Sequence, residues 1–178
     1  MMKILVTGAN GQLGTETVSL LSQDGDYEVR GFDRQELDIT NAEQVMKKVC
    51  DFRPDWILHC AAYTNVEQAE GDGLEANWKI NREGSVNISK AAHEVGAKLM
   101  TISTDYVFDG RKTSPYTPED EPNPLNEYGK AKLAGEQAVR YYCPDAYIIR
   151  TSWVFGEHGQ NFVYTMLKSA ERKNVLKG

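Results

Sequence analysis

The chain has 178 residues, of which 40% are hydrophobic and 26% charged, and its formal net charge is −6 at pH 7. These values are typical of one globular domain, and they exclude a disordered tail, a collagen-like fibre and a coiled coil. Lys and Arg are scattered, so no basic stripe is available for a nucleic acid. The longest apolar run, residues 56–63, is too short to cross a bilayer, and the N-terminus does not have the pattern of a signal peptide.

The cysteines and histidines, three of each, are dispersed along the chain. This spacing predicts neither a disulfide framework nor a Cys/His zinc site. His59, within a predicted strand, is expected to be a core histidine with a hydrogen-bonded ring. We therefore expect a reduced, cytoplasmic protein without a bound metal.

The predicted elements alternate between short apolar strands and longer helices. In chain order they are a strand at 3–7, a helix at 12–21, a strand at 27–32, a short strand at 38–40, a helix from a cap at 40 or 41 to 52, a strand at 56–60, a helix at 74–95, a strand at 98–103, a helix at 128–142, a strand at 146–151 and a helix at 161–172. Such alternation predicts an α/β fold, a Rossmann-type doubly wound parallel sheet with helices on both faces. The proline-rich segment 104–126 is predicted to be a long irregular loop, and such loops are often functional.

Small or polar residues follow directly on most of the predicted strands. These residues are Thr7 and Gly8, Asp33, Ala61 and Ala62, Ser103 and Thr104, and Thr151 and Ser152. In open parallel sheets, ligands bind at the carboxyl ends of the strands, near the point where the strand order reverses. The sequence therefore predicts a ligand site at this edge of the sheet.

The turn after the first strand has the pattern G-x-x-G-x-x-G, formed by Gly8, Gly11 and Gly14. The first glycine permits the tight turn, the second lets the backbone approach a pyrophosphate, and the third lets the helix pack closely. The helix N-terminus offers N–H groups and positive dipole to phosphates. Asp33 could accept hydrogen bonds from ribose hydroxyls, which favours NAD, whereas Arg34 could bind the extra phosphate of NADP. We predict a dinucleotide site and leave the choice between NADH and NADPH open.

Tyr128 and Lys132 lie one turn apart on a predicted helix that follows the long loop. A nearby ammonium group is expected to lower the pKa of the phenol and make it a usable acid or base. Tyr164 and Lys168 have the same spacing, but no strand-end hydroxyl is expected near them, so we assign Tyr164 to packing. The strand end at Thr104 favours Tyr128 and Lys132 as the catalytic pair.

Five strings in chain order carry a family resemblance, at residues 7–14, 59–67, 103–110, 128–136 and 150–156. They resemble the extended short-chain dehydrogenase/reductase family of nucleotide-sugar enzymes, and within it the reductases that act on a dTDP-sugar. The string Ser-Thr-Asp-Tyr-Val-Phe-Asp-Gly at 103–110 is far more specific than the glycine turn.

The resemblance implies hydride transfer from NADH or NADPH to the C4 ketone of dTDP-4-dehydro-L-rhamnose, giving dTDP-L-rhamnose for cell-surface polysaccharide. It implies that Tyr128 protonates the reacting oxygen, that Lys132 tunes Tyr128 and binds ribose, and that Thr104 hydrogen-bonds the same oxygen. Asp105 and Trp153 would contact the sugar. The cofactor would be lined by Gly8, Asn10, Gly11, Gln12, Leu13, Gly14, Asp33, Asp38, Ile39, Ala61, Ala62, Tyr63 and Thr64, together with the catalytic Tyr128 and Lys132.

Members of this family continue into a smaller C-terminal lobe, so we expect residues 1–178 to be the NAD(P)-binding domain of a longer protein. Some members carry a magnesium ion at a dimer contact, where only Glu16 corresponds; we predict no metal and leave a homodimer open. Two alternatives remain. A non-catalytic regulatory subunit is disfavoured because both residues of the Tyr–Lys pair are present, and an epimerase or dehydratase is disfavoured because Asp105 is followed by Tyr106 rather than by a second carboxylate.

Overall fold

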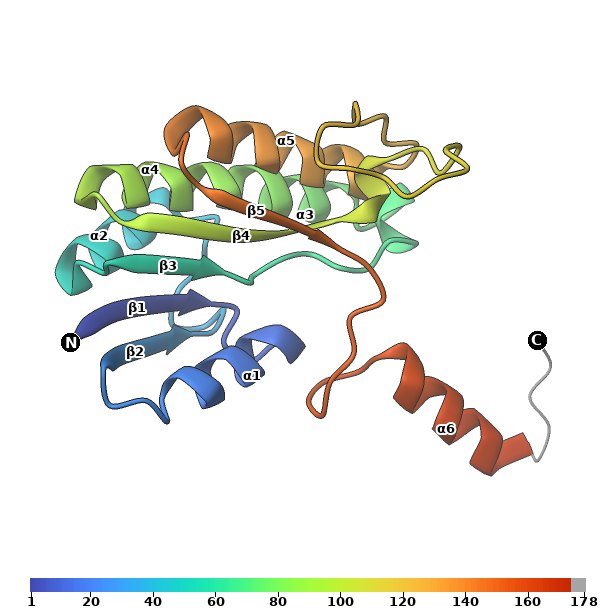
Figure 1. Ribbon diagram of the computed structural model, residues 1–178, viewed down its shortest axis with the longest axis horizontal. Coiled ribbons are helices and arrows are strands. Elements are labelled where there is room, and N and C mark those ends of the chain that lie inside the picture. Colours follow the sequence, from blue (N-terminus) through green and yellow to red (C-terminus); the bar gives the residue numbers. More distant parts are fainter. Residues whose placement is uncertain (174–178) are drawn as a thin grey trace.

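The computed structural model describes residues 1–173, which contain a parallel sheet of five strands in the order β2-β1-β3-β4-β5 (Figure 1). The strands are β1 (Met2–Thr7), β2 (Tyr27–Phe32), β3 (Trp56–His59), β4 (Lys98–Thr104) and β5 (Tyr147–Thr151). Because β2 and β3 pair with opposite edges of β1, the strand order reverses at β1. Ligand sites in such sheets lie at this reversal.

Helices cover both faces of the sheet, as predicted. The helices are α1 (Gln12–Leu21), α2 (Ala42–Phe52), α3 (Leu74–Trp78), α4 (Ser85–Val95), α5 (Glu127–Tyr142) and α6 (Phe162–Lys173), with short helical segments η1 (Gln68–Glu70), η2 (Lys79–Gly84) and η3 (Asp105–Val107). Figure 1 shows α2, α4 and α5 on one face and α1 on the other, while α6 extends away from the sheet. The predicted Rossmann-type arrangement is confirmed.

The core lies on both faces of the central strands, because successive side chains of a strand point in opposite directions. Leu5 and Ile57 belong to the larger cluster, which packs with α2, α4 and α5. Val6 and Leu58 belong to a smaller cluster on the opposite face. Burial on both faces explains the continuous apolar runs of β1 and β3, since parallel strands are covered on both sides.

Residues 38–40 do not form the predicted strand. The Asp38 carboxylate instead accepts hydrogen bonds from the backbone N–H and the hydroxyl of Thr40, at 2.9 and 2.8 Å. Asn41 then caps α2 by accepting a hydrogen bond from the backbone N–H of Gln44 at 3.0 Å. Asp and Asn side chains compete with strand pairing by bonding to nearby backbone groups, and here that local pattern prevails.

The helix predicted at residues 74–95 is interrupted by a π-helical segment, η2, between α3 and α4. The Ser85 hydroxyl donates a hydrogen bond to the Asn81 carbonyl oxygen at 2.7 Å, and Gly135 of α5 packs so closely that an added Cβ would overlap the same oxygen. The wider helical turn therefore lies where α5 packs directly against this helix. The helix ends, as predicted, at Gly96, whose φ is +72°.

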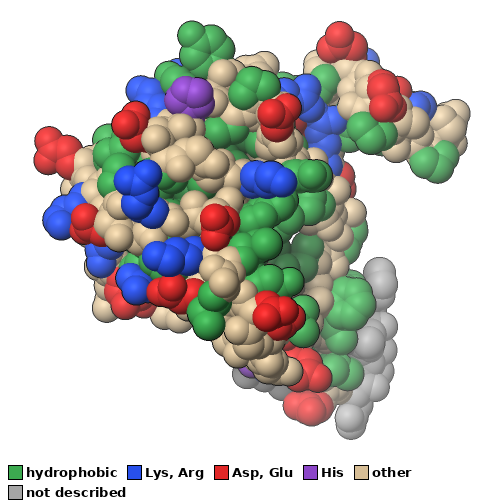
Figure 2. Space-filling model, turned by 60° about the vertical axis from the view of Figure 1, so that its left-hand side comes forward, with side chains coloured by type: hydrophobic (Ala, Val, Ile, Leu, Met, Phe, Trp, Pro, Cys, Tyr) green, Lys and Arg blue, Asp and Glu red, His purple; other side chains and the backbone are tan. Residues whose placement is uncertain are grey.

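Charged side chains of both signs are interspersed on the face shown in Figure 2, as the scattered Lys and Arg of the sequence indicated. Within residues 1–173, no helix has the length and hydropathy needed to cross a membrane.

Candidate functional site

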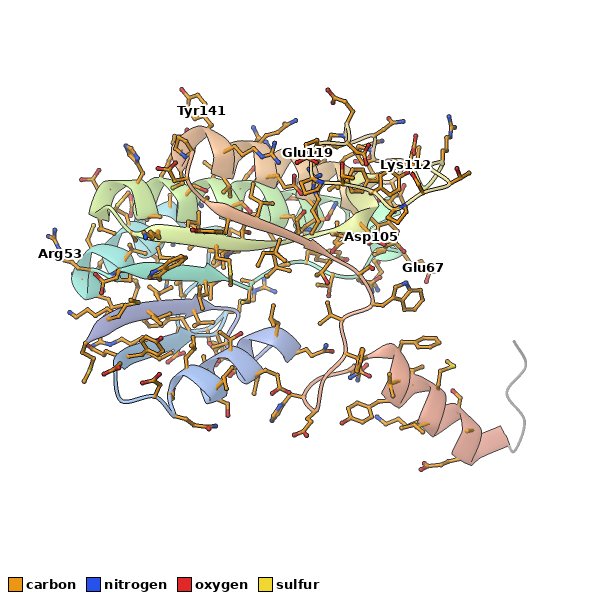
Figure 3. The ribbon with its side chains drawn as sticks, in the orientation of Figure 1. Arg53, Glu67, Asp105, Lys112, Glu119 and Tyr141 are labelled. Atoms are coloured by element: carbon orange, nitrogen blue, oxygen red, sulfur yellow. The ribbon has the colours of Figure 1, made fainter. Side chains whose placement is uncertain are left out.

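The residues that follow the strands gather at one edge of the sheet, as predicted. Figure 3 shows Asp105 and Glu67 at this edge, beyond the ends of β4 and β3, and Arg53 at the opposite edge. The irregular loop with Lys112 and Glu119 lies above the same edge. The carboxyl ends of the parallel strands therefore present loop and side-chain groups to one region.

The glycine turn leaves no room for side chains at two of its positions. Gly8 has a φ of +67°, and an added Cβ would lie 2.8 Å from the Cα and the N of Ala61. An added Cβ at Gly14 would overlap the carbonyl oxygen of Gly8 and lie 2.9 Å from the Cα of Ala9. Glycine is therefore required at both positions, and at Gly14 the close contact is to the turn itself.

Helix α1 begins immediately after this turn with its backbone donors open. Gly11 is its N-cap, and among the described residues no side chain caps this end and no acidic residue lies in the first turn. The first N–H groups of a helix have no partner within the helix. The turn residues Asn10, Gln12 and Leu13 thus surround a ready anion-binding site.

A buried hydrogen-bond chain ties this turn to the end of β3. His59 Nδ1 lies 2.8 Å from Thr7 Oγ1, and the Ala61 backbone N–H donates to the same oxygen at 3.2 Å. Burial lowers the pKa of His59 to about 3, so the ring is neutral, and its Nδ1 shares a hydrogen bond with the Thr7 hydroxyl. The prediction of a hydrogen-bonded core histidine is confirmed.

At the end of β2, Asp33 is held against the glycine turn. Asn10 Nδ2 donates to Asp33 Oδ2 at 2.7 Å, and Oδ1 accepts the backbone N–H groups of Gln35 and Glu36 at 2.8 and 3.0 Å. The structure therefore brings together the acidic residue and the turn. It does not bring in the Ile39 side chain, which is buried in the core.

The loop 61–64, with Ala61, Ala62, Tyr63 and Thr64, is fastened by a residue that the sequence analysis missed. Asn81 of η2 accepts a hydrogen bond from the Tyr63 backbone N–H at 3.1 Å and donates to its carbonyl oxygen at 3.0 Å. Its amide also donates to Asn77 Oδ1 at 2.8 Å. The signal in the sequence was the spacing of Asn77 and Asn81, which lie one helical turn apart. On a buried helix face, amides at this spacing need hydrogen-bond partners.

Tyr128 and Lys132 lie at the start of α5, which Asn126 caps through the Gly129 backbone N–H at 2.8 Å. Each is 9% exposed. The ring of Tyr128 packs edge-on against Tyr106, with centroids 5.7 Å apart. Both predicted catalytic side chains are therefore held in a mostly dry environment.

The pKa of the Tyr128 phenol is raised, mainly by burial, although a hydrogen bond with Thr104 acts in the opposite direction. The predicted lowering of this pKa by Lys132 is therefore wrong. Lys132 Nζ donates to the Ile102 carbonyl oxygen at 2.7 Å, and burial lowers the pKa of Lys132 to about 8. Desolvation dominates both groups because they lie under the end of β4.

A pocket of about 540 Å³ lies at the same edge of the sheet, and neither Tyr128 nor Lys132 is among its lining residues. Its lining consists of Asp105, Tyr106, Phe108, Asp109, Gly110, Tyr116, Leu125, Asn126, Ser152 and Trp153. Thr104 Oγ1 donates to Asp105 Oδ1 at 3.1 Å, which joins the pocket to the Tyr–Lys pair. Trp153 has a φ of +53°, is 74% exposed and packs edge-on against Phe162 at 5.2 Å. Asp105 and Trp153, predicted separately, thus line one pocket.

Glu16, the position that the resemblance connects with magnesium, makes contacts within the chain. Its Oε1 lies 2.8 Å from His158 Nδ1 and accepts the Glu157 backbone N–H at 3.2 Å. These bonds lower the pKa of Glu16 and join α1 to the segment before α6.

A Rossmann-type sheet with a glycine-rich first turn, and a Tyr–Lys pair one helical turn apart behind a strand-end threonine, define the short-chain dehydrogenase/reductase class. Within this class the comparison is more specific. Residues 2–177 match the model of the RmlD substrate binding domain family, and the chain belongs to this family.

Individual relatives agree with this assignment. The chain is 43% identical over 176 residues to the dTDP-4-dehydrorhamnose reductase of Aggregatibacter actinomycetemcomitans, covering 99% of this chain and 60% of that protein. The crystal structure of the Bacillus anthracis dTDP-4-dehydrorhamnose reductase in complex with NADP has a TM-score of 0.94 and 43% identity, covering 97% of this chain and 62% of that one. The predicted resemblance to dTDP-sugar reductases is confirmed.

The fold extends to more distant enzymes. UDP-glucose 4-epimerase from Brucella ovis in complex with NAD has a TM-score of 0.83 at 20% identity, covering 99% of this chain and 63% of that one, which shows a common fold alone. The chain spans about three fifths of the length of the curated relatives that it matches.

Proposed function

We propose that this chain is the dinucleotide-binding part of a dTDP-4-dehydrorhamnose reductase, which reduces the C4 ketone of dTDP-4-dehydro-L-rhamnose with NADH or NADPH. The observation that carries this proposal is the buried Tyr128 beside Thr104, one helical turn before the buried Lys132. The names of relatives at 43% identity support the substrate.

The residues present fit a dinucleotide cofactor. The glycine turn is a cradle that a Cβ at Gly8 or Gly14 would fill, and the start of α1 offers backbone donors to phosphates. Asp33 and Asn10 stand where the adenosine ribose is expected. The NADP complex of the Bacillus anthracis relative supports this cofactor class, and Arg34 beside Asp33 is the cation available to an extra phosphate.

When bound, the reduced nicotinamide supplies a hydride to the carbonyl carbon. The side chains of this chain provide the proton and the environment. Because the pKa of Tyr128 is raised, its phenol is protonated near neutral pH and can donate to the developing alkoxide. The Thr104 hydroxyl positions the same oxygen. Lys132, one helical turn after Tyr128, is proposed to bind the ribose of the cofactor. Asp105 and Trp153 are proposed to hold the sugar in the pocket.

We extend the proposal to the organisation of the protein: residues 1–178 are its cofactor-binding domain. A cytoplasmic location, a homodimer and the lack of nucleic-acid binding stay predictions.

The test compares NADH oxidation by the purified protein with dTDP-4-dehydro-L-rhamnose for the parent, Tyr128→Phe and Tyr164→Phe. Tyr164 has the same spacing to Lys168, but its hydroxyl donates to the Glu157 carbonyl oxygen at 3.1 Å, away from the pocket residues. Loss of the proton donor is expected to lower kcat by about 10²–10⁴-fold, while the control variant keeps the parent rate.

A thermal shift with NADH separates binding from turnover. Equal rates for the parent and Tyr128→Phe would remove this tyrosine from the mechanism. A parent protein that binds NADH but oxidises none of it would favour the non-catalytic regulatory subunit. A parent protein whose melting temperature does not change with saturating NADH would contradict the cofactor site.

A further inference from the structure

A buried ion pair lies behind the Tyr–Lys pair. Glu136 on α5 and Arg150 on β5 bond through two parallel contacts, Nε to Oε1 at 2.9 Å and Nη2 to Oε2 at 2.7 Å. Their side chains are 3% and 14% exposed. A buried pair adds little net stability because both charges lose water, so its geometry is the more informative property.

Arg150 also contacts a residue of the pocket wall. Its guanidinium carbon lies 4.9 Å from the centroid of the Phe108 ring, which is stacked on Tyr116 with centroids 4.1 Å apart and an interplanar angle of 12°. Tyr116 in turn donates to Asp109 Oδ1 at 3.0 Å. We call Glu136, Arg150, Phe108 and Tyr116 the Glu136 column. Its two rings form part of the pocket wall.

The first member of the column also faces the catalytic lysine. Glu136 lies one turn after Lys132 on α5, and its charge favours the ammonium form of that lysine. The other titratable groups around Lys132 are His59 at the end of β3, Cys60 directly after it, and Tyr128 of α5. Burial keeps the imidazole and the thiol neutral, with pKa values of about 3 and 11. Among the described residues, the Glu136 carboxylate is therefore the group that most strongly opposes the desolvation of Lys132, and Cys60 acts in the same direction to a smaller extent.

We propose that Glu136 is a positioning residue of this site, which holds the pocket wall through Arg150 and retains the ammonium form of Lys132 by its charge. The inference rests on the proposed reductase function for its kinetic consequences. One carboxylate thereby couples the group that supports proton transfer to the wall that contacts substrate. Neither Glu136 nor Arg150 is among the residues that line the pocket.

The test measures the titration of Lys132 by NMR of labelled lysine side chains in the purified protein. In Glu136→Gln the midpoint is expected to fall by about one pH unit, because the opposing charge is lost while the shape is kept. Arg150→Lys keeps a cation but loses the two parallel hydrogen bonds to Glu136 and the contact with the Phe108 ring. The Lys132 midpoint in this variant is therefore expected to stay at the parent value or above it. Asp51→Asn, which removes an exposed ion pair with Lys47, is the control.

Kinetics give the second readout. In Glu136→Gln, the fall of kcat at alkaline pH is expected to begin at lower pH than in the parent. Arg150→Lys is expected to raise KM for the sugar nucleotide about tenfold without lowering the pH at which kcat falls. A general loss of structure would instead change both variants in the same way. A parent protein without NADH oxidation would refute the proposed function, yet the lysine titration would still decide this inference.

Folding of the variants is controlled separately. If Glu136→Gln does not fold, the double variant Glu136→Leu with Arg150→Met removes both charges together, which buried pairs tolerate better than the loss of one partner. Because this variant also removes the Arg150 cation, the Lys132 midpoint is expected to fall by less than in Glu136→Gln. A folded variant of either kind whose Lys132 titrates at the parent midpoint would overturn the proposal.

Discussion

Replacing Gly14 with alanine tests the geometry of the glycine turn. In a helix, Gly→Ala normally raises stability by about 1 kcal/mol. At Gly14, however, the new Cβ would overlap the Gly8 carbonyl oxygen and lie 2.8 Å from the Gly8 carbonyl carbon. Both atoms belong to the backbone, so the turn must move, and overpacking of this kind costs about 1–3 kcal/mol. The difference is a net loss of up to about 2 kcal/mol, which lowers the melting temperature by up to roughly 8 °C.

The cofactor readout is expected to be more sensitive than stability. At about 100 times its Kd, NADH stabilises the parent by about 2.7 kcal/mol, or roughly 5–11 °C, and Gly14→Ala should lose most of this shift because the turn is displaced. Gly25→Ala is the matched control, since an added Cβ there meets no described atom within 4 Å. A Gly14→Ala protein with the parent unfolding free energy and the parent NADH shift would refute the reasoning.

Three further predictions concern buried polar groups. Burial lowers the pKa of His59 from 6.5 to about 3, so the stability present above pH 6.5 is lost as pH falls toward 3. Denaturation experiments should show that the unfolding free energy falls by about 3 kcal/mol between pH 7 and 4. In His59→Gln this dependence on pH should be much weaker. Burial lowers the pKa of Lys132 from 10.5 to about 8, so the stability of the parent should rise as pH increases from 8 to 10.5. In Lys132→Met this rise should be absent and NADH oxidation should be lost. The variant should also be at least as stable as the parent at pH 7. Asn81→Ala removes both hydrogen bonds to the Tyr63 backbone. It should lower the unfolding free energy by about 2–3 kcal/mol and weaken NADH binding. A variant with the parent values of both quantities would show that the loop 61–64 keeps its conformation without Asn81.

Much of the fold was predictable because its signals are local. The apolar run of β1, the glycines at 8 and 14 and the cap at Asn41 each reflect a backbone requirement that neighbouring residues satisfy. The resemblance added the site residues, and the structure gathers most of them at one sheet edge. Local reasoning failed at residues 38–40, where the pattern of a strand and the hydrogen bonds of a turn competed and the turn prevailed.

The sequence alone was sufficient for the order of strands and helices, the glycine turn and the spacing of Tyr128 and Lys132. Only the tertiary structure decided the direction of the Tyr128 pKa, the role of Asn81 and the pairing of Glu136 with Arg150. The physical reason is the range of the interactions. Periodicity and φ depend on adjacent residues, whereas the solvation and partners of a buried polar group depend on which distant elements pack around it.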